Sequence, residues 1–145
     1  MTIKIDKDLI VYGLDANTRK DAISKIADLY VSAGIVTDKQ AYLDAVEYRE
    51  SEGTTGIGDG IAIPHGKSDV VTRSAVAIAK LKHPVEWASL DNEPVENVFL
   101  LTIPEGGDNE HLKILSEIAS QLMDDDVREA LSKADSVFSL SQIFN

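Results

Sequence analysis

The sequence predicts an α/β fold: a single domain over residues 1–145, with a mixed parallel and antiparallel sheet of about five strands and helices on both faces. Two observations predict it. Residues 75–82 and 97–104 are apolar runs long enough to be central strands, whereas residues 18–34 and 110–123 repeat apolar side chains at helical spacing. No internal repeat and no Pro/Ser-rich linker separates these elements, so one shared core is expected.

The amino-terminal part is expected to form a strand and then a helix. Residues 9–12, LIVY, are a short apolar run typical of an opening strand. Asn17 stands where a helix N-cap belongs, and Gly34 is expected to end that helix. The apolar residues that recur at helical spacing give it one buried face: Ala22, Ile23, Ile26, Ala27, Leu29, Tyr30 and Ala33.

A second helix and a glycine-rich loop come next. Thr37 or Asp38 can cap a helix over residues 39–51. Its inward side is expected to carry Tyr42, Ala45 and Val46. The glycines at 53, 56, 58 and 60 disfavour any further helix, and residues 61–64, IAIP, are expected to form a short buried strand.

The carboxyl-terminal part is expected to be helical. The stretch 110–123 begins just after Asp108 or Asn109, either of which can cap it, and one or two more helices should complete the chain. The apolar residues of this stretch that are expected on one buried face are Leu112, Leu115, Ile118, Ala119 and Leu122.

The composition excludes several classes of function. The chain has no cysteine, which rules out disulfides, thiol nucleophiles and cysteine-bound metals. Its net charge of −11, from 25 acidic and 14 basic residues, disfavours nucleic acid as a partner. No signal-like or membrane-spanning apolar run is present, so a cytoplasmic location without direct membrane insertion is expected. The acidic runs lack the spacing of a calcium loop, so neither a metal nor a cofactor is expected.

His65 is the strongest candidate for a chemical role. It follows the predicted strand 61–64 directly, and the ends of strands are where α/β sheets place their sites. Pro64 restricts the backbone before the histidine, and Gly66 lets other backbone approach closely after it. A neutral imidazole is nucleophilic near pH 7, because its ordinary pKa is about 6.5. The pattern therefore predicts a rigidly held, accessible nucleophile.

The segment around His65 resembles the fructose/mannitol-type enzyme IIA family (EIIA type 2) of the phosphoenolpyruvate-dependent sugar phosphotransferase system (PTS). The family pattern has an acidic or amide residue seven positions before an apolar-Gly pair, and it ends in Ile-Ala-Ile-Pro-His-Gly. The stretch EHLKIL, residues 110–115, is similar to the family's second-histidine helix. The matching residues of the first motif are Glu50, Ile57, Gly58, Ile61, Ala62, Ile63, Pro64, His65 and Gly66.

This resemblance implies a phosphocarrier. His65 would accept a phosphoryl group from phospho-HPr and donate it to a IIB component, which serves a membrane IIC permease. Fructose, mannitol or a related sugar is the implied cargo. Arg49 and His111 would stabilise the phosphoryl group; an arginine fork suits phosphate, and a histidine in the first turn of a helix is expected to be neutral and donating.

Two threonines of the loop and one residue at the end of the preceding helix are also placed with the phosphoryl group. Thr54 and Thr55 are expected to donate hydroxyl hydrogen bonds to the phosphoryl oxygens or to the second nitrogen of His65, and Glu50 is grouped with them. A shallow apolar docking surface with acidic residues at its rim is expected around His65, because two different partners must reach it in turn.

Other interpretations stay open at this point. A nitrogen-branch regulatory IIA protein would have the same fold and the same histidine, but would act by phosphorylation-dependent partner binding. A metal-dependent hydrolase is disfavoured, because no HExxH-like spacing is present. Arg49 could serve only the electrostatics of a helix end. His83 is expected to be a solvated turn residue, and Trp87 could anchor either the core or a docking surface.

Overall fold

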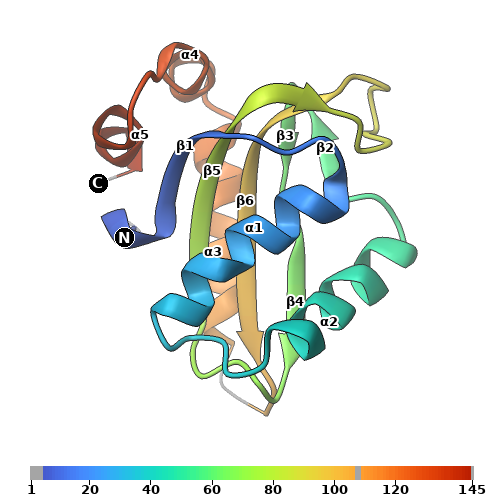
Figure 1. Cartoon of the computed structure of the whole chain (residues 1–145). Coiled ribbons are helices and arrows are strands. Elements are labelled where there is room, and N and C mark those ends of the chain that lie inside the picture. Colours follow the sequence, from blue (N-terminus) through green and yellow to red (C-terminus); the bar gives the residue numbers. More distant parts are fainter. Residues whose placement is uncertain (1–4, 107–108, 145) are drawn as a thin grey trace.

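The computed structural model describes residues 5–106 and 109–144 (Figure 1). A short 3₁₀ turn, η1 (Lys7–Leu9), precedes the first strand. The strands are β1 (Ile10–Leu14), β2 (Gly56–Gly58), β3 (Ile61–Ala62), β4 (His65–Ser68), β5 (Ala75–Val85) and β6 (Val95–Pro104). The helices are α1 (Arg19–Ser32), α2 (Lys39–Ser51), α3 (Glu110–Leu122), α4 (Asp125–Lys133) and α5 (Val137–Phe144).

The sheet is mixed, as the sequence predicts. The strand order is β1-β5-β6-β3-β2, and β4 pairs with β6 beyond the end of β3. β1 is parallel to β5, β5 is antiparallel to β6, and both β3 and β4 are parallel to β6. The two short strands keep one register, since Ala62 lies opposite Val98 and His65 lies opposite Leu101. β3 and β4 therefore act as a single strand position beside β6, with an interruption at Ile63 and Pro64.

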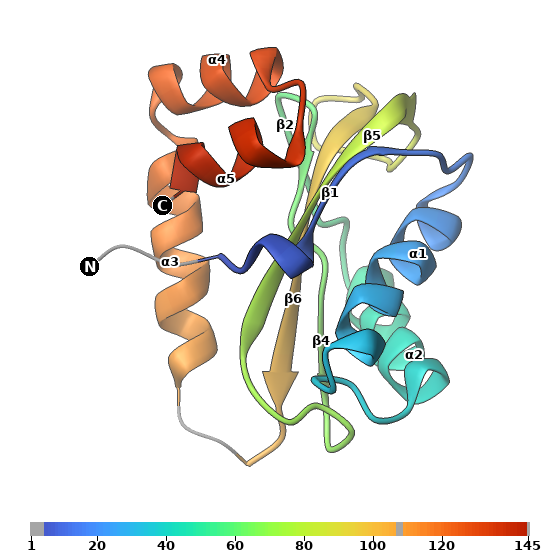
Figure 2. The same cartoon turned by 60° about the vertical axis from the view of Figure 1, so that its left-hand side comes forward.

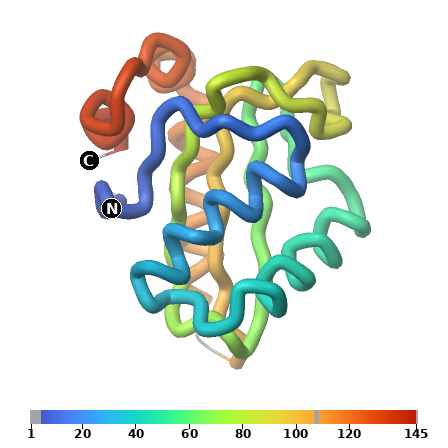
Figure 3. The backbone as a smooth tube through the Cα atoms, in the orientation of Figure 1, coloured from blue at the N-terminus to red at the C-terminus, as the bar shows by residue number. Residues whose placement is uncertain are grey.

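Helices cover both faces of this sheet. α1 and α2 lie on one face, whereas α3, α4 and α5 lie on the other (Figure 2). β5 and β6 are buried on both sides, which is why they read as continuous apolar runs rather than as alternating ones. Ala77 and Leu100 belong to the core under α1 and α2, and Ile78 and Phe99 to the core under the other helices. Following the chain in Figure 3, α5 returns to pack beside β1 and η1.

Several local predictions need correction. Thr18, not Asn17, caps α1: its side chain accepts the N–H of Asp21. Both residues are good caps, and only the backbone path decides between them. For α2, the structure selects Asp38. In α3, Leu112 is 52% exposed and Ala119 is also exposed, because the helix presents Ile114, Leu115, Ile118 and Leu122 to the sheet instead.

Two strands also differ from expectation. β3 covers only Ile61 and Ala62, because the chain leaves the ladder before Pro64, which has no N–H to donate. β5 runs on to Val85, so His83 lies in a strand and not in a turn, although it is exposed as expected. Within residues 5–106 and 109–144, no helix is long and apolar enough to cross a membrane.

Candidate active site

His65 sits in the break between β3 and β4. The chain is held on both sides of it: the N–H of Ile63 donates to the carbonyl of Thr55, and the N–H of Leu101 donates to the carbonyl of Pro64. The ring itself is half-buried, and its Nδ1 lies 3.1 Å from the carbonyl oxygen of Ile63. A carbonyl can only accept, so in the neutral ring this contact requires the proton on Nδ1. In that tautomer Nε2 keeps its lone pair, so it is the ring nitrogen that is able to act as a nucleophile.

The surroundings of His65 favour its neutral form. Burial is the largest cause and lowers its pKa below the ordinary 6.5. The hydrogen bond to Ile63 raises the pKa, the Arg49 charge lowers it, the Glu50 charge raises it and His111 lowers it. The net direction is downward, so the ring is neutral at pH 7 and can act as a nucleophile.

Arg49 approaches this ring from the last turn of α2. One of its terminal nitrogens donates to the carbonyl of Gly53 over 2.8 Å, which orients the guanidinium. Within the described parts of the chain the other guanidinium N–H groups have no protein partner, and they are available to an anion. The charge of Arg49 lowers the pKa of His65, and its expected role in stabilising the phosphoryl group stays a prediction.

His111 comes to the same ring from the opposite layer. It is the second residue of α3, in the first turn as expected, and it also acts electrostatically on His65. Its Nδ1 is buried without a hydrogen-bond partner among the described residues. Asn109 occupies the N-cap position but makes no capping hydrogen bond with its side chain, and the alternative cap, Asp108, lies outside the described residues. The first turn of α3 therefore brings an imidazole with an unpartnered Nδ1 toward His65.

The hydroxyls of Thr54 and Thr55 have partners other than His65. Thr54 donates to the carbonyl of Trp87 over 3.1 Å, and Thr55 donates to Glu50 Oε1 over 2.6 Å. Each threonine has a single hydroxyl proton, so neither can donate to a phosphoryl group in this arrangement. Their expected role as phosphate donors stays a prediction that would require a change of partners.

Glu50 is buried, and Thr55 occupies both of its carboxylate oxygens. Oε2 accepts the backbone N–H of Thr55 over 2.7 Å, while Oε1 accepts its hydroxyl. In this arrangement Glu50 acts on His65 through its charge alone. A carboxylate would also repel an incoming phosphate, so direct contact with the phosphoryl group is not what this geometry favours.

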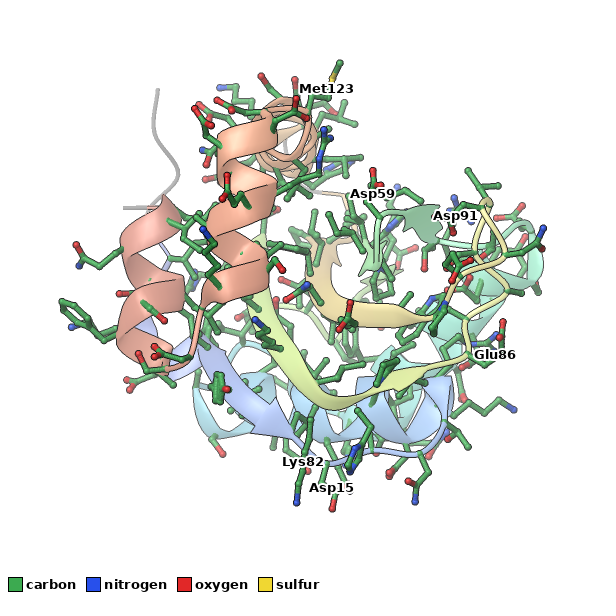
Figure 4. All side chains as sticks on the ribbon, turned by 90° about the horizontal axis from the view of Figure 1, so that it is seen from above. Asp15, Asp59, Lys82, Glu86, Asp91 and Met123 are labelled. Carbon is green, nitrogen blue, oxygen red and sulfur yellow. The ribbon has the colours of Figure 1, made fainter. Side chains whose placement is uncertain are left out.

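The sequence left open whether Trp87 anchors the core or a docking surface. In the structure it is part of the core. The side chain is 1% exposed, and its indole N–H donates to the hydroxyl of Thr55 over 3.2 Å. It lies at the start of the loop between β5 and β6, and this loop contacts β2, because the N–H of Leu90 donates to the carbonyl of Gly56. Asp59 and Asp91 meet there, with the N–H of Asp59 donating to Asp91 over 3.0 Å (Figure 4). No local pattern in the sequence signals this long-range contact.

Three exposed apolar side chains lie on elements that carry or adjoin the candidate site residues. Tyr48 on α2, Ile57 on β2 and Leu112 on α3 are 69%, 46% and 52% exposed, and each lies on or beside an element that contributes to the site. Two cavities, of about 280 Å³ between α1 and α2 and about 100 Å³ beneath α4, are not lined by His65, Arg49 or His111. Among the described residues, no cluster of three or more His, Asp or Glu is arranged to hold a metal.

Comparison with known families identifies the chain. Residues 4–145 match the family described as "Phosphoenolpyruvate-dependent sugar phosphotransferase system, EIIA 2". The protein therefore belongs to this family of PTS enzyme IIA proteins, which have a phosphotransferase role at the general level. The resemblance seen in the sequence motifs is confirmed.

Curated relatives include members of two functional branches. The chain is 43% identical to the fructose-specific EIIA component of Haloferax volcanii over 82% of this chain and 77% of that protein. It is 35% identical to the fructose-specific EIIABC component of Bacillus subtilis over its whole length, but spans only 23% of that protein. It is also 35% identical to a nitrogen regulatory protein of Bradyrhizobium diazoefficiens, over 90% of this chain and 85% of that one.

Solved structures show the same two branches. The nitrogen regulatory protein IIA-Ntr of Neisseria meningitidis superposes with a TM-score of 0.88 at 27% identity, covering 97% of this chain and 96% of that one. IIA mannitol of Escherichia coli gives a TM-score of 0.82 at 25% identity, covering 99% and 100%. The α/β fold with a mixed sheet is thus shared across the family.

Proposed function

We propose that residues 1–145 form one IIA domain that carries phosphoryl groups on Nε2 of His65, taking them from phospho-HPr in the cytoplasm and passing them to a IIB component. One observation carries the proposal. His65 is half-buried with Nδ1 directed to the carbonyl of Ile63, and Arg49 and His111 act on it from α2 and α3. A neutral imidazole with one free lone pair beside a fixed cation is suited to accept a phosphoryl group.

The transfer step follows from this arrangement. The Nε2 lone pair forms the new N–P bond while the bond from phosphorus to the donor breaks, and its electron pair stays with the donor. Because Nδ1 keeps its proton, positive charge develops on the ring, which the carbonyl of Ile63 and the nearby Glu50 charge stabilise. Arg49 and His111 lie where charge on the phosphoryl oxygens has to be neutralised. Transfer to the IIB component is the reverse step with a different partner.

The acceptor protein and the transported sugar are proposed from what the related proteins bind and transport. The Escherichia coli mannitol protein has been solved in complex with a phosphorylated enzyme IIB, and fructose is named in the H. volcanii and B. subtilis relatives. A IIB component, and through it a membrane IIC permease for fructose, mannitol or a related sugar, is accordingly the favoured chain of transfer. The exposed Tyr48, Ile57 and Leu112 supply apolar contacts for the docking surface.

A second candidate is a nitrogen-branch regulator. The likeness to the N. meningitidis protein, with a TM-score of 0.88, and the 35% identity to the B. diazoefficiens protein support it. Phosphorylation of the same histidine would then control partner binding instead of feeding a permease. The site chemistry is the same in both cases, so only the acceptor distinguishes them.

Reconstitution tests the proposal. The chain is incubated with phosphoenolpyruvate, Enzyme I and HPr, phosphoryl uptake is followed by intact mass, and fructose-type and mannitol-type IIB proteins are then added. Uptake by wild type, its loss in His65→Ala and onward transfer to a sugar-specific IIB are expected. Uptake without transfer to any IIB would favour the regulatory branch, and normal uptake by His65→Ala would refute the phosphocarrier role.

A further inference from the structure

A buried line of hydrogen bonds joins Trp87 to the carboxylate of Glu50. The indole N–H donates to the hydroxyl of Thr55 over 3.2 Å, and that hydroxyl donates to Glu50 over 2.6 Å. All three side chains are buried, with exposed fractions of 1%, 4% and 8% for Trp87, Thr55 and Glu50. Indole can only donate and a carboxylate can only accept, so the direction of both bonds is determined.

The carboxylate needs these donors because of its location. Glu50 lies in the last turn of α2, where the helix dipole disfavours a negative charge and burial removes most of its water. Thr55 compensates with two donors, its backbone N–H and its hydroxyl. Trp87 in turn occupies an acceptor site of that hydroxyl, which leaves the hydroxyl proton directed to Glu50.

The same threonine also reaches His65 through the backbone. Its carbonyl accepts the N–H of Ile63 over 3.0 Å, and the carbonyl of Ile63 lies 3.1 Å from Nδ1 of His65. Residue 55 thus fixes the carboxylate whose charge acts on the imidazole and, through the N–H of Ile63, the residue whose carbonyl selects the His65 tautomer. Trp87 is tied to this loop a second time, because its own carbonyl accepts the hydroxyl of Thr54.

We propose that Trp87 and Thr55 are positioning residues for phosphoryl transfer: through Ile63 they keep the proton of the neutral His65 ring on Nδ1, and they hold Glu50 where its charge stabilises the phosphorylated ring. Neither touches the phosphoryl group. The inference rests on the phosphocarrier function proposed above, and it gives Thr55 a different role from the phosphate donor that the motif suggests. When Thr55 loses its hydroxyl, Glu50 Oε1 loses its donor and only the backbone N–H of Thr55 still holds the carboxylate, so both the carboxylate and the loop beside Ile63 are held less firmly.

The variants must distinguish a role of Trp87 and Thr55 in stability alone from a role in orienting Glu50 and His65. Thr55→Val is nearly isosteric and removes only the hydroxyl, whereas Thr55→Ser keeps it. Trp87→Phe removes the indole N–H and keeps an aromatic ring. Ile26→Val, at a fully buried position of α1, serves as a control that lowers stability without touching this line of hydrogen bonds.

Two measurements are made on each variant: the His65 tautomer in the unphosphorylated protein, by ¹⁵N NMR of the imidazole, and the initial rate of uptake from phospho-HPr. In Thr55→Val and Trp87→Phe we expect more of the Nε2–H tautomer and uptake slowed by about tenfold, which is the lower end of the losses that follow removal of the hydrogen-bond partners of metal-bound histidines. Thr55→Ser should restore both readings, and Ile26→Val should leave both unchanged.

The outcomes separate this inference from the proposed function. An unchanged tautomer and rate in both Thr55→Val and Trp87→Phe would overturn the positioning role while leaving the phosphocarrier intact. Equal loss in Thr55→Val and Ile26→Val would also overturn it, since stability alone would then explain the effect. If wild type takes up no phosphoryl group, the proposed function fails, and the tautomer measurement still tests whether the two residues orient His65.

Discussion

Gly66 is where the close packing of α2 on β4 can be tested by one methyl group. A Cβ at this position would lie 2.8 Å from Cγ2 of Val46, 3.0 Å from the backbone nitrogen of Val46 and 3.2 Å from Cε1 of Tyr42. Carbon atoms in good contact lie about 3.5–4.0 Å apart, so all three distances are too short. The side-chain atoms can rotate a little, but the backbone nitrogen can move only with the helix.

Gly66→Ala should therefore push α2 away from the sheet. Overpacking of this kind costs about 1–3 kcal/mol of unfolding free energy, and a loss of about 2 kcal/mol would lower the melting temperature by about 6 °C in a domain of this size. Because α2 carries Arg49, the rate of phosphoryl uptake should fall as well. Urea denaturation, thermal melting and the uptake assay measure the three effects.

Val46→Ala provides the matched control. It removes the Cγ2 atom that the new methyl group meets first, so the double variant Gly66→Ala/Val46→Ala should lose about 1 kcal/mol less than the sum of the two single changes. A stability of Gly66→Ala within about 0.5 kcal/mol of wild type would refute the steric reasoning. Strict additivity in the double variant would do the same.

Three more predictions concern other parts of the structure. Tyr42→Phe leaves the buried carbonyl of Leu101 without the hydroxyl that it accepts over 2.7 Å, and should cost about 1–2 kcal/mol in urea denaturation, whereas no loss would contradict this. Lys80→Met removes an ammonium that donates to the carbonyls of Leu131, Ser132 and Ala134 at the end of α4. Faster amide hydrogen exchange is therefore expected in α4. Unchanged exchange would show that these hydrogen bonds do not stabilise the helix. His65 should titrate below pH 6.5 when followed by NMR, because folding lowers its pKa. Its neutral form therefore contributes stability above pH 6.5, and this contribution is lost as the pH falls through the folded pKa. A titration midpoint above 6.5 would contradict the burial argument.

Much of the fold was predictable because its signals are local. The apolar runs that became β5 and β6 are continuous, as strands buried on both faces must be, and Asp38 and Gly34 mark helix ends by their own chemistry. What failed depended on packing. Leu112 and Ala119 share a helical face with buried residues, yet the rotation of α3 on the sheet leaves them exposed.

The site divides in the same way. The proline and glycine beside His65 are read directly from the sequence, and so is its place at a strand end. The contact between Thr55 and Trp87 joins residues 32 positions apart and leaves no local pattern, so the hydroxyl could only be assigned to the phosphate by family resemblance. The interruption between β3 and β4 is likewise set by pairing with β6, which composition does not reveal.

The most direct test of the central claim is ¹⁵N NMR of the histidine-labelled protein after phosphorylation by phospho-HPr. The account predicts phosphorus–nitrogen coupling at Nε2 of His65, with Nδ1 still protonated and hydrogen-bonded to Ile63. Coupling at Nδ1 of His65, or at His83 or His111, would contradict it.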